Sequence, residues 1–292
     1  MNQADVSVII VNFNCGPLLT QCVESVLAST VSIEVFVSDN GSTDGSIELL
    51  ERKVFDERLH IILNSENLGF AKGSNIPLKQ ACGDYLLFLN PDCIIQPDTI
   101  EKMIFTMQEH PDAGMSGCLI LNSDGSEQAG CRRRVPTPAR SLIRMLHLDK
   151  PFPFLREKGV SLTEQPLPEF PVEMEAISGA FMLVSRKALE DVGPLDEGYF
   201  LHCEDLDWCM RFRSHGWKIL FVPDVAVMHA KGECSKGRAV RVEWHKHKGM
   251  VRFYRKFFRH QYPALLMWFV ITAVWVRFFL LSIVLTVRGL LR

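Results

Sequence analysis

Short apolar runs alternate with helical stretches along the N-terminal part of the chain, and this order limits the possible folds more than any other feature. Val6–Asn12 is short, continuous and β-branched, as buried strands are, and residues 18–28 favour a helix. The same order repeats through Ile33–Asp39 up to an expected strand over residues 114–121. The alternation predicts an α/β fold with a mostly parallel central sheet. In such sheets, ligands bind beyond the carboxyl ends of the strands.

The remaining elements extend this pattern to about residue 236. Residues 122–171 are rich in Pro, Arg and Gly, with a short helix-like stretch at 141–148, and we expect a variable, partly mobile insertion there. A catalytic domain over residues 1–236 would contain this insertion. Further strands are expected over residues 59–64, 85–90, 172–185 and 219–222, and helices over 46–55, 71–80, 98–110, 186–192 and 204–215.

Residues 237–292 differ from the rest, because they predict a basic amphipathic helix followed by a hydrophobic one. Residues 263–287 contain one charge, Arg277, and are long enough to span a bilayer, although that charge makes a helix lying in the interface an alternative. A packed helical hairpin or a homodimer interface is a further alternative. Over residues 238–259 one helix face carries Arg241, His245, Lys248, Arg252, Arg255 and Arg259, and another carries Trp244, Val251, Tyr254 and Phe258.

Composition excludes several classes of protein. The net charge of -2 gives no general electrostatic case for nucleic acid as a partner. The N-terminus lacks the charged and apolar regions of a secretory signal. The nine cysteines form no CxxC pair, so we expect reduced thiols packed as small apolar residues and no zinc site. Residues 12–17 lack the GxGxxG fingerprint that an NAD-dependent oxidoreductase would need.

Two polar stretches near strand ends suit a nucleotide. Asp39, in the stretch SDNGSTDGS, can accept a hydrogen bond from the N3–H of a pyrimidine, and the turn leads to a helix N-terminus that favours anions. An ordinary strand-to-helix turn with a capping Ser or Asp is the alternative. The stretch NLGFAKGSN, residues 67–75, supplies small residues that let a helix start lie close to a ligand.

Two further residues suit a metal ion. Asp92 follows a predicted strand within Asn90-Pro91-Asp92, and a carboxylate in a rigid turn suits Mg²⁺ or Mn²⁺ shared with substrate phosphates. His229 could bind the same ion or touch phosphate. A Pro-containing turn and an ordinary core or surface histidine are the alternatives.

The stretch FLHCEDLDW contains a candidate general base. Asp205 lies three residues before Trp208 and seven before Phe212, on the apolar side of the expected helix, so its carboxylate faces inward. Such a group could take the proton of an acceptor hydroxyl. Asp207 is also available, and acidic residues at a helix start also complement the helix dipole without any catalysis.

Taken together and in this order, the motifs closely resemble the family 2 glycosyltransferases, with their GT-A, Rossmann-like fold, and most of all the rhamnosyltransferase-like branch. The resemblance covers about residues 5–236, and neither the insertion nor the C-terminal segment is part of it. The matching stretches are VSVIIVNFN, SDNGSTDGS, NLGFAKGSN, NPD, ISGAFMLVSR, GPLDEGYFLHCEDLDWCMRFRSHGW and MHAKGECS.

The resemblance implies roles for these residues. Asp205 would be the catalytic base, preceded by Glu204, and Asp92 and His229 would hold Mg²⁺ or Mn²⁺. Asn90 stands where the family's Asp-x-Asp motif has its first Asp. The nucleotide-sugar would contact Val11, Asn12, Asn14, Asp39, Asn40, Gly41, Asn67, Gly69, Phe70, Gly73, Asn75, Asn90, Pro91, Gly179 and Ala180.

The resemblance also implies an inverting transferase that moves a sugar, with rhamnose from dTDP-rhamnose as the best choice. The acceptor would be a polyprenyl-diphosphate-linked saccharide at the cytoplasmic face of the plasma membrane, in cell-surface polysaccharide synthesis. A UDP-linked hexose or N-acetylhexosamine as donor, and a non-catalytic nucleotide-sugar-binding module, are the alternatives.

Overall fold

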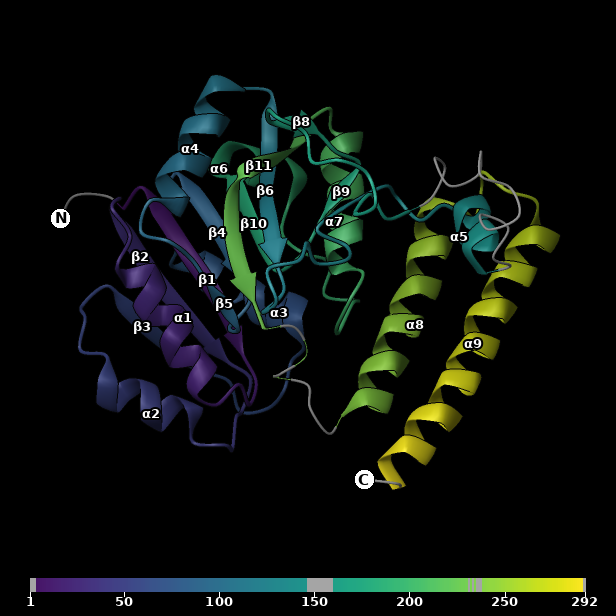
Figure 1. Cartoon of the computed structure of the whole chain (residues 1–292), viewed down its shortest axis with the longest axis horizontal. Coiled ribbons are helices and arrows are strands. Elements are labelled where there is room, and N and C mark those ends of the chain that lie inside the picture. Colours follow the sequence, from purple (N-terminus) through teal and green to yellow (C-terminus); the bar gives the residue numbers. More distant parts are fainter. Residues whose placement is uncertain (1–3, 146–159, 231, 233, 235–237, 291–292) are drawn as a thin grey trace.

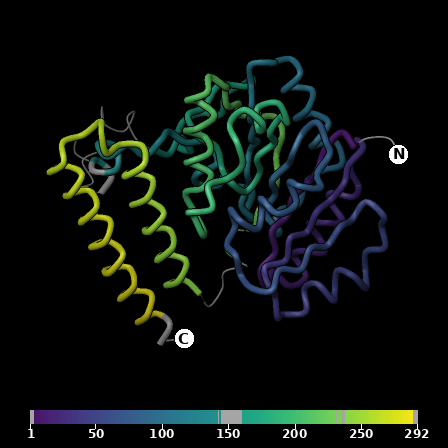
Figure 2. Tube along the Cα trace, turned by 180° about the vertical axis from the view of Figure 1, so that it is seen from behind, coloured from purple at the N-terminus to yellow at the C-terminus, as the bar shows by residue number. Residues whose placement is uncertain are grey.

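A computed structural model of the chain describes residues 4–145, 160–230, 232, 234 and 238–290 (Figure 1). The expected catalytic part, residues 1–236, is built on one large sheet covered by helices on both faces, and two long C-terminal helices stand beside it (Figures 1 and 2).

The central sheet is parallel on one side and mixed on the other. Its order is β3-β2-β1-β4-β10-β6-β11-β5. Strands β3, β2, β1 and β4 run parallel, β10 is antiparallel to both of its neighbours, and β6 and β11 are parallel to each other. The bounds are β1 (Val6–Asn12), β2 (Ile33–Asp39), β3 (Leu59–Leu63), β4 (Tyr85–Leu89), β5 (Cys93–Ile94), β6 (Ala113–Leu121), β10 (Phe181–Ser185) and β11 (Lys218–His229).

Each face of the sheet has its own core. In β1, Val8 and Ile10 join one apolar cluster while Ile9 joins the other, because successive strand residues point to opposite faces. The first cluster includes side chains of α1 (Pro17–Leu27), α2 (Ser46–Lys53) and α4 (Thr99–Glu109); the second includes side chains of α3 (Phe70–Asn75), α6 (Arg186–Val192) and α7 (Glu204–Ser214). The predicted α/β fold is confirmed.

Some predicted elements differ from the structure. The helix expected over residues 71–80 ends at Asn75, and a short 3₁₀ turn, η1 (Pro77–Lys79), follows. Pro77 explains the break, since it has no backbone N–H to continue the helical hydrogen bonds. The strand expected over residues 219–222 continues to His229. Pro223 lies at a register shift within this strand and not in a turn after it.

Residues 172–185 do not form one strand. They divide into β8 (Val172–Glu173), β9 (Ala176–Ile177) and β10, because the chain leaves the main sheet at β9. There β9 pairs with β7 (Arg132–Arg133), which belongs to the expected insertion. The described part of that insertion is therefore not a free appendage.

The described part of residues 122–171 packs onto the domain. Gln128, Cys131 and Arg132 are buried, and Arg132 forms an ion pair with Glu127 at 2.9 Å. The short helix expected over residues 141–148 is α5 (Pro138–Met145), and its predicted end lies outside the described residues.

The C-terminal part is a hairpin of α8 (Ala239–Phe257) and α9 (Ala264–Leu290). Both helices add apolar side chains to the core cluster that contains α7. The Tyr254 hydroxyl lies 2.6 Å from the Ser141 hydroxyl, and Lys256 Nζ lies 2.6 Å from Asp207 Oδ2. Within α9, residues 264–288 are long and apolar enough to cross a membrane, by length and composition.

The expectation that all cysteines are reduced is wrong for one pair. Cys15, after β1, and Cys234, after β11, form a disulfide. The two residues are 219 positions apart in the sequence, and only the fold brings their turns together. Six of the seven remaining cysteines are buried, as expected for small apolar residues.

Candidate active site

The sheet topology brings the predicted site residues to one edge. The carboxyl ends of β1, β2, β4 and β11 lie at this edge, and antiparallel β10 begins there. The ends of β1 and β2 carry Val11, Asn12, Asn14, Asp39, Asn40 and Gly41; the start of α3 carries Asn67, Gly69, Phe70, Gly73 and Asn75; the turn after β4 carries Asn90, Pro91 and Asp92; Gly179 and Ala180 precede β10, Glu204 and Asp205 begin α7, and His229 ends β11.

Asp39 is held in a fixed position with room for one more hydrogen bond. Its Oδ1 accepts from Asn12 Nδ2 at 2.7 Å and from the Ser42 hydroxyl at 2.6 Å, and its Oδ2 accepts from the Ser42 backbone N–H at 2.9 Å. A carboxylate offers about four lone-pair positions. One position is therefore left on Oδ2, which is what the N3–H of a pyrimidine would need.

The turn after β1 is tied to the turn after β2. Asn14 has a φ of 56° and its side-chain oxygen accepts from the Thr43 backbone N–H at 2.7 Å. The Gly16 backbone N–H donates to Asp44 Oδ2 at 2.7 Å. The two turns therefore form one preorganised wall of the edge.

Small residues at the start of α3 allow a close approach to the same wall. A Cβ at Gly73 would lie 3.0 Å from Val11 and 3.2 Å from the Asn40 side chain. Asn40 Nδ2 in turn donates to the Gly69 carbonyl at 3.0 Å. The amide of Asn75 instead donates to the Leu195 carbonyl at 2.9 Å, so it joins α3 to the loop before α7.

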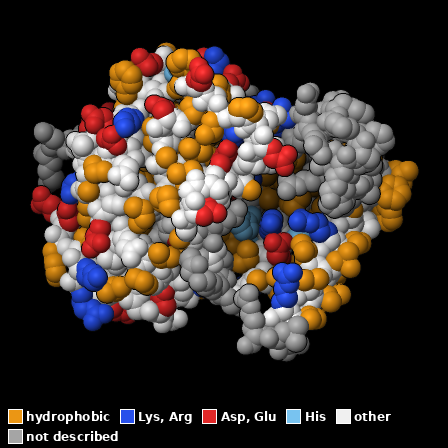
Figure 3. Space-filling view, in the orientation of Figure 1, with side chains coloured by type: hydrophobic (Ala, Val, Ile, Leu, Met, Phe, Trp, Pro, Cys, Tyr) orange, Lys and Arg blue, Asp and Glu red, His pale blue; other side chains and the backbone are white. Residues whose placement is uncertain are grey.

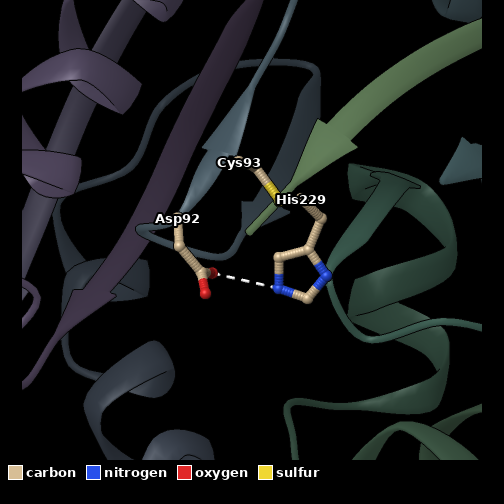
Figure 4. A group of neighbouring side chains, drawn as sticks. All are labelled: Asp92, Cys93 and His229. Carbon is tan, nitrogen blue, oxygen red and sulfur yellow. Dashed lines mark ion pairs between the residues drawn. The ribbon is translucent and has the colours of Figure 1, made fainter. Parts of the chain in front are cut away.

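Asp92 and His229 face each other although 137 residues of sequence separate them (Figure 4). His229 Nε2 lies 3.0 Å from Asp92 Oδ1, and the two side chains are 8% and 6% exposed. On the other side of the ring, Nδ1 lies 2.7 Å from Gln128 Oε1. Gln128 Nε2 donates to the His229 carbonyl and to Asn122 Oδ1, so its Oε1 must be the acceptor and His229 Nδ1 the donor.

This assignment decides what the pair can hold. With a proton on Nδ1, neutral His229 turns a lone pair on Nε2 toward the Asp92 carboxylate. Two acceptors 3.0 Å apart need a proton or a cation between them. Carboxylate oxygen and imidazole nitrogen, with an outer amide fixing the ring, are a usual ligand set for a divalent cation. The arrangement of Asp92 and His229 therefore fits the expected metal ion.

Cys93 completes the group of possible ligands, since its sulfur lies within 4.8 Å of the ligand atoms of Asp92 and His229. Its thiol, however, donates to the Ala180 carbonyl at 3.5 Å, inside the apolar core. Burial raises the pKa of the Cys93 thiol well above its usual value. A thiol that stays protonated is a poor metal ligand, which leaves Asp92 and His229.

Asp205 is held at the start of α7 by three donors. Its Oδ1 accepts from the Leu206 backbone N–H at 2.7 Å, and its Oδ2 accepts from the Gly179 backbone N–H at 3.2 Å and from Arg133. By the same lone-pair count as for Asp39, one position remains, on Oδ1, for the proton of a substrate hydroxyl.

The neighbouring Glu204 is in a different state. Burial, and then the charge of Asp205, raise the pKa of Glu204 to about 8. Its Oε2 is buried without a hydrogen-bond partner among the described residues. Burial therefore favours the protonated form of Glu204, which makes Asp205 the better candidate for the general base.

A short turn connects the two charged centres. Gly179 donates to Asp205, and the carbonyl of the next residue, Ala180, accepts from the Asn90 backbone N–H at 3.0 Å. Asn90 Nδ2 lies 3.3 Å from His229 Nε2. The carboxylate of Asp205 and the Asp92–His229 pair thus lie on opposite sides of one backbone turn.

Sequence reasoning missed Gln128 and Arg133, the residues that orient His229 and Asp205. Both lie in the segment that looked like a variable insertion, and no periodic pattern marks them. The only hint was the density of arginines in residues 132–134. Phe200 was also missed: its carbonyl accepts from the Phe70 backbone N–H at 2.7 Å.

An α/β fold with polar turns after β1 and β2, a carboxylate–histidine pair and a separate carboxylate at one sheet edge is the arrangement expected of a glycosyltransferase of the GT-A kind. The family model "Glycosyl transferase family 2" matches residues 7–193, and the chain belongs to this family. A second model, "Glycosyl transferase family group 2", matches residues 162–291.

Curated relatives include rhamnosyltransferases of polysaccharide biosynthesis. The chain is 31% identical to the N-acetylglucosaminyl-diphospho-decaprenol L-rhamnosyltransferase of Mycobacterium tuberculosis, over 79% of this chain and 77% of that protein. It is 24% identical to the rhamnosyltransferase WbbL of Escherichia coli, over 77% of this chain and 83% of that protein. The chain is thus a rhamnosyltransferase-like glycosyltransferase of polysaccharide biosynthesis.

Solved structures share the fold. A mannosyltransferase of Pyrobaculum calidifontis, in complex with GDP-Man and Mn²⁺, superposes with a TM-score of 0.60 at 17% identity, over 94% of this chain and 69% of that chain. This likeness confirms the predicted GT-A architecture.

Proposed function

We propose that this enzyme is a metal-dependent, inverting rhamnosyltransferase. It would move rhamnose from dTDP-rhamnose to a polyprenyl-diphosphate-linked saccharide at the cytoplasmic face of the plasma membrane. The observation that carries the proposal is the placement of Asp205 and the Asp92–His229 pair on either side of the Gly179–Ala180 turn. The names of the relatives support rhamnose as the sugar.

Each part of the donor would have a partner at the edge. The thymine N3–H would use the open lone-pair position of Asp39. The diphosphate would lie near Asp92 and His229, which would hold Mg²⁺ or Mn²⁺. When bound, such an ion neutralises charge on a nucleoside diphosphate as it leaves. The sugar carbon would then lie between this pair and Asp205.

Asp205 would be the general base of a single displacement. The oxygen of the acceptor hydroxyl forms a bond to the anomeric carbon while the bond from that carbon to the diphosphate oxygen breaks. The hydroxyl proton passes to the open position on Asp205 Oδ1. Attack from the side opposite the diphosphate inverts the anomeric configuration. Arg133 and Gly179 would keep the carboxylate pointing at the hydroxyl.

A basic pocket beside the catalytic part suits the diphosphate of the acceptor. The pocket has a volume of about 510 Å³ and is lined by Gly198, Lys248, Val251, Arg252, Arg255, Lys256 and Trp275. Asp196 pairs with Arg252 and Lys256, while Lys248 and Arg255 have no ion-pair partner among the described residues. The excess positive charge favours a phosphate-bearing lipid.

A panel of nucleotide-sugars tests this proposal. The detergent-solubilised full chain would be assayed for binding and hydrolysis of dTDP-rhamnose, UDP-glucose, UDP-N-acetylglucosamine and GDP-mannose, with Mn²⁺ and with EDTA. We expect selective use of dTDP-rhamnose, lost on chelation. Selective use of a UDP-sugar would replace the donor and keep the mechanism. Binding of a donor without any turnover would favour a non-catalytic nucleotide-sugar-binding module, and binding of no donor would contradict the proposal.

A further inference from the structure

The outer face of α9 is an apolar stripe that runs along the whole helix. Its residues follow each other at helical spacings and are all at least 44% exposed, and Figure 3 shows hydrophobic side chains along the outer edge of the α8–α9 lobe. At 1.5 Å per residue the stripe is about 33 Å long. Its members are Leu265, Trp268, Phe269, Val276, Phe279, Leu280, Ile283, Val284 and Val287.

The opposite face of α9 is packed against α8. Met267, Val270, Val274 and Phe278 are buried there. Ring contacts join the two helices near the middle of α9: the Trp244 ring lies 5.2 Å from the Trp275 ring and 5.4 Å from the Phe278 ring.

The hairpin is in turn tied to the catalytic part. Arg252 Nη2 lies 2.8 Å from Asp196 Oδ1, and Lys256 Nζ lies 2.6 Å from Asp207 in α7. Val274 of α9 and Trp208 of α7 belong to the same core cluster. The catalytic part thus holds α8, and α8 holds the packed face of α9.

This packing opposes a bilayer-spanning position for α9. A spanning α9 would take α8 into the hydrocarbon with it, and with α8 the cations Arg241, Lys246, Lys248, Arg252, Arg255 and Lys256. Charged side chains are strongly disfavoured at that depth. If α9 instead lies along the membrane surface, its stripe enters the apolar layer while α8 and the catalytic part stay in the aqueous and headgroup region.

The charges of α9 agree with this orientation. At 100° per residue, Arg277 lies at the margin of the stripe, between its exposed and its packed face. In a flat helix, a marginal Arg can extend to the headgroups, whereas in a spanning helix it would sit near mid-depth. Trp268 is an aromatic of the kind that prefers the membrane interface.

We propose that α8 and α9 form a monotopic anchor, in which α9 lies in the plane of an anionic bilayer and α8 separates it from the catalytic part. The proposal rests on the membrane location proposed above but not on the identity of the donor sugar. A failure of rhamnosyl transfer would therefore not contradict the anchor. A failure of the anchor would likewise not contradict rhamnosyl transfer.

Depth-dependent fluorescence quenching tests the orientation. Cys82 is the exposed thiol among the described cysteines outside the disulfide, so a Cys82→Ser background permits site-specific labelling. Leu265→Cys, Val276→Cys and Ile283→Cys would place a fluorophore at both ends and the middle of the stripe. Phe55→Cys, 88% exposed on the catalytic part, is the matched control. Labelled full-length protein would be bound to vesicles of phosphatidylethanolamine and phosphatidylglycerol.

We expect all three stripe positions to be quenched best by nitroxides placed near the headgroups, and the Phe55 position by none. Strongest quenching of position 276 by nitroxides near the acyl chain ends, with shallow quenching at 265 and 283, would mean a spanning helix and overturn the proposal. No quenching at the stripe, with a dimer in solution, would mean that a second copy covers it and would also overturn it.

A second variant keeps the test independent of labelling. Phe269→Glu with Phe279→Glu should weaken cosedimentation with the same vesicles about a hundredfold, because charged groups replace two exposed rings that would enter the apolar layer of the bilayer. Unchanged hydrolysis of the donor would show that the variant is folded. Cosedimentation equal to that of the unchanged protein would contradict the anchor.

Discussion

At the scale of single residues, the site depends on two side chains from the segment before β8 that hydrogen-bond its catalytic and metal-binding candidates. Arg133 and Gln128 each fix one chemically important residue, Asp205 and His229. Protein partners occupy most hydrogen-bonding positions of Asp205 and of the Asp92–His229 pair. The few positions that remain open determine which ligand groups can bind.

Arg133→Met should lower kcat by about 10²-fold, because a small displacement of a catalytic group is that costly. Arg133→Lys should restore part of the loss. Arg140 belongs to the same segment and pairs with Glu175 at 2.6 Å. Arg140→Met is therefore the matched control, because it removes an ion pair that does not include Asp205. Steady-state transfer assays compare the three. Equal rates for Arg133→Met and the unchanged enzyme would contradict a positioning role.

Gln128→Leu should weaken Mn²⁺ binding about 10–100-fold, because outer-shell partners orient the ligand ring. Calorimetric titration of Mn²⁺ in the presence of the nucleoside diphosphate measures this directly. Asn122 Oδ1 accepts from Gln128 Nε2, one hydrogen bond further from His229, so Asn122→Ala serves as a milder comparison. If Gln128→Leu binds the ion as tightly as the unchanged protein, His229 is not the ligand that we propose.

Glu204 should make stability depend on pH. Its pKa is about 8 when folded, raised by burial and then by Asp205, against an ordinary value of 4.5. Between these values the folded state binds more protons than the unfolded state, so the free energy of unfolding falls as pH rises, by at most about 1.4 kcal/mol per pH unit. Urea unfolding from pH 5 to 8 should show a smaller slope for Glu204→Gln. If the unfolding free energy of both proteins changed equally with pH, the pKa of Glu204 in the folded state would be near its ordinary value.

At the scale of helices and strands, the sequence predicted the regular elements well and their connections poorly. β1 and β2 match the expected bounds, since continuous β-branched runs end at polar turns. The strand β7 was not predicted, and β9 was not distinguished within the strand expected over residues 172–185, because each is two residues long and forms only by pairing with the other. The Cys15–Cys234 disulfide also depends on long-range folding.

The positions of site residues relative to strands and helices decided which of them could be predicted. Asp39, Asp92, Asp205 and His229 were identified because they follow strands or begin a helix, where a pattern exists. The pairing of Asp92 with His229 required the topology of β11, whose length beyond Pro223 the sequence did not indicate. Gln128 lies in irregular chain and Arg133 in the two-residue strand β7, so no periodicity could single them out.

The junction between α3 and the loop before α7 should tolerate no side chain at Gly69. A Cβ there would lie 2.5 Å from the Phe200 carbonyl oxygen, and the residue has a φ of 82°. Gly125→Ala has the same backbone strain, at φ 81°, with nothing within 4 Å. We expect Gly69→Ala to lose about 2–4 kcal/mol of unfolding free energy and Gly125→Ala about 1 kcal/mol. Thermal unfolding of both variants measures this difference. Equal losses of unfolding free energy would contradict the close contact between Gly69 and Phe200.

At the scale of the whole molecule, a rigid catalytic part is joined to a helical hairpin with one basic and one apolar side. On insertion scales each Lys or Arg at the bilayer centre costs about 2.5–3.5 kcal/mol, so the cations of α8 oppose insertion far more than one Arg in α9 would. Near an anionic surface the same cations each contribute about 1 kcal/mol of attraction. With the apolar face of α9 in the bilayer and the cations of α8 outside it, the basic pocket would lie at the level of the lipid headgroups. A lipid-linked acceptor presents its diphosphate at that level.

The most direct test of the proposed activity is transfer of radiolabelled rhamnose from dTDP-rhamnose to an N-acetylglucosaminyl-diphosphoryl-polyprenol in vesicles. The full-length enzyme should form labelled lipid with Mn²⁺ and none with EDTA, and Asp205→Asn should be slower by about 10²–10⁴-fold while binding the donor normally. Equal rates for Asp205→Asn, or transfer that persists in EDTA, would contradict the proposed mechanism.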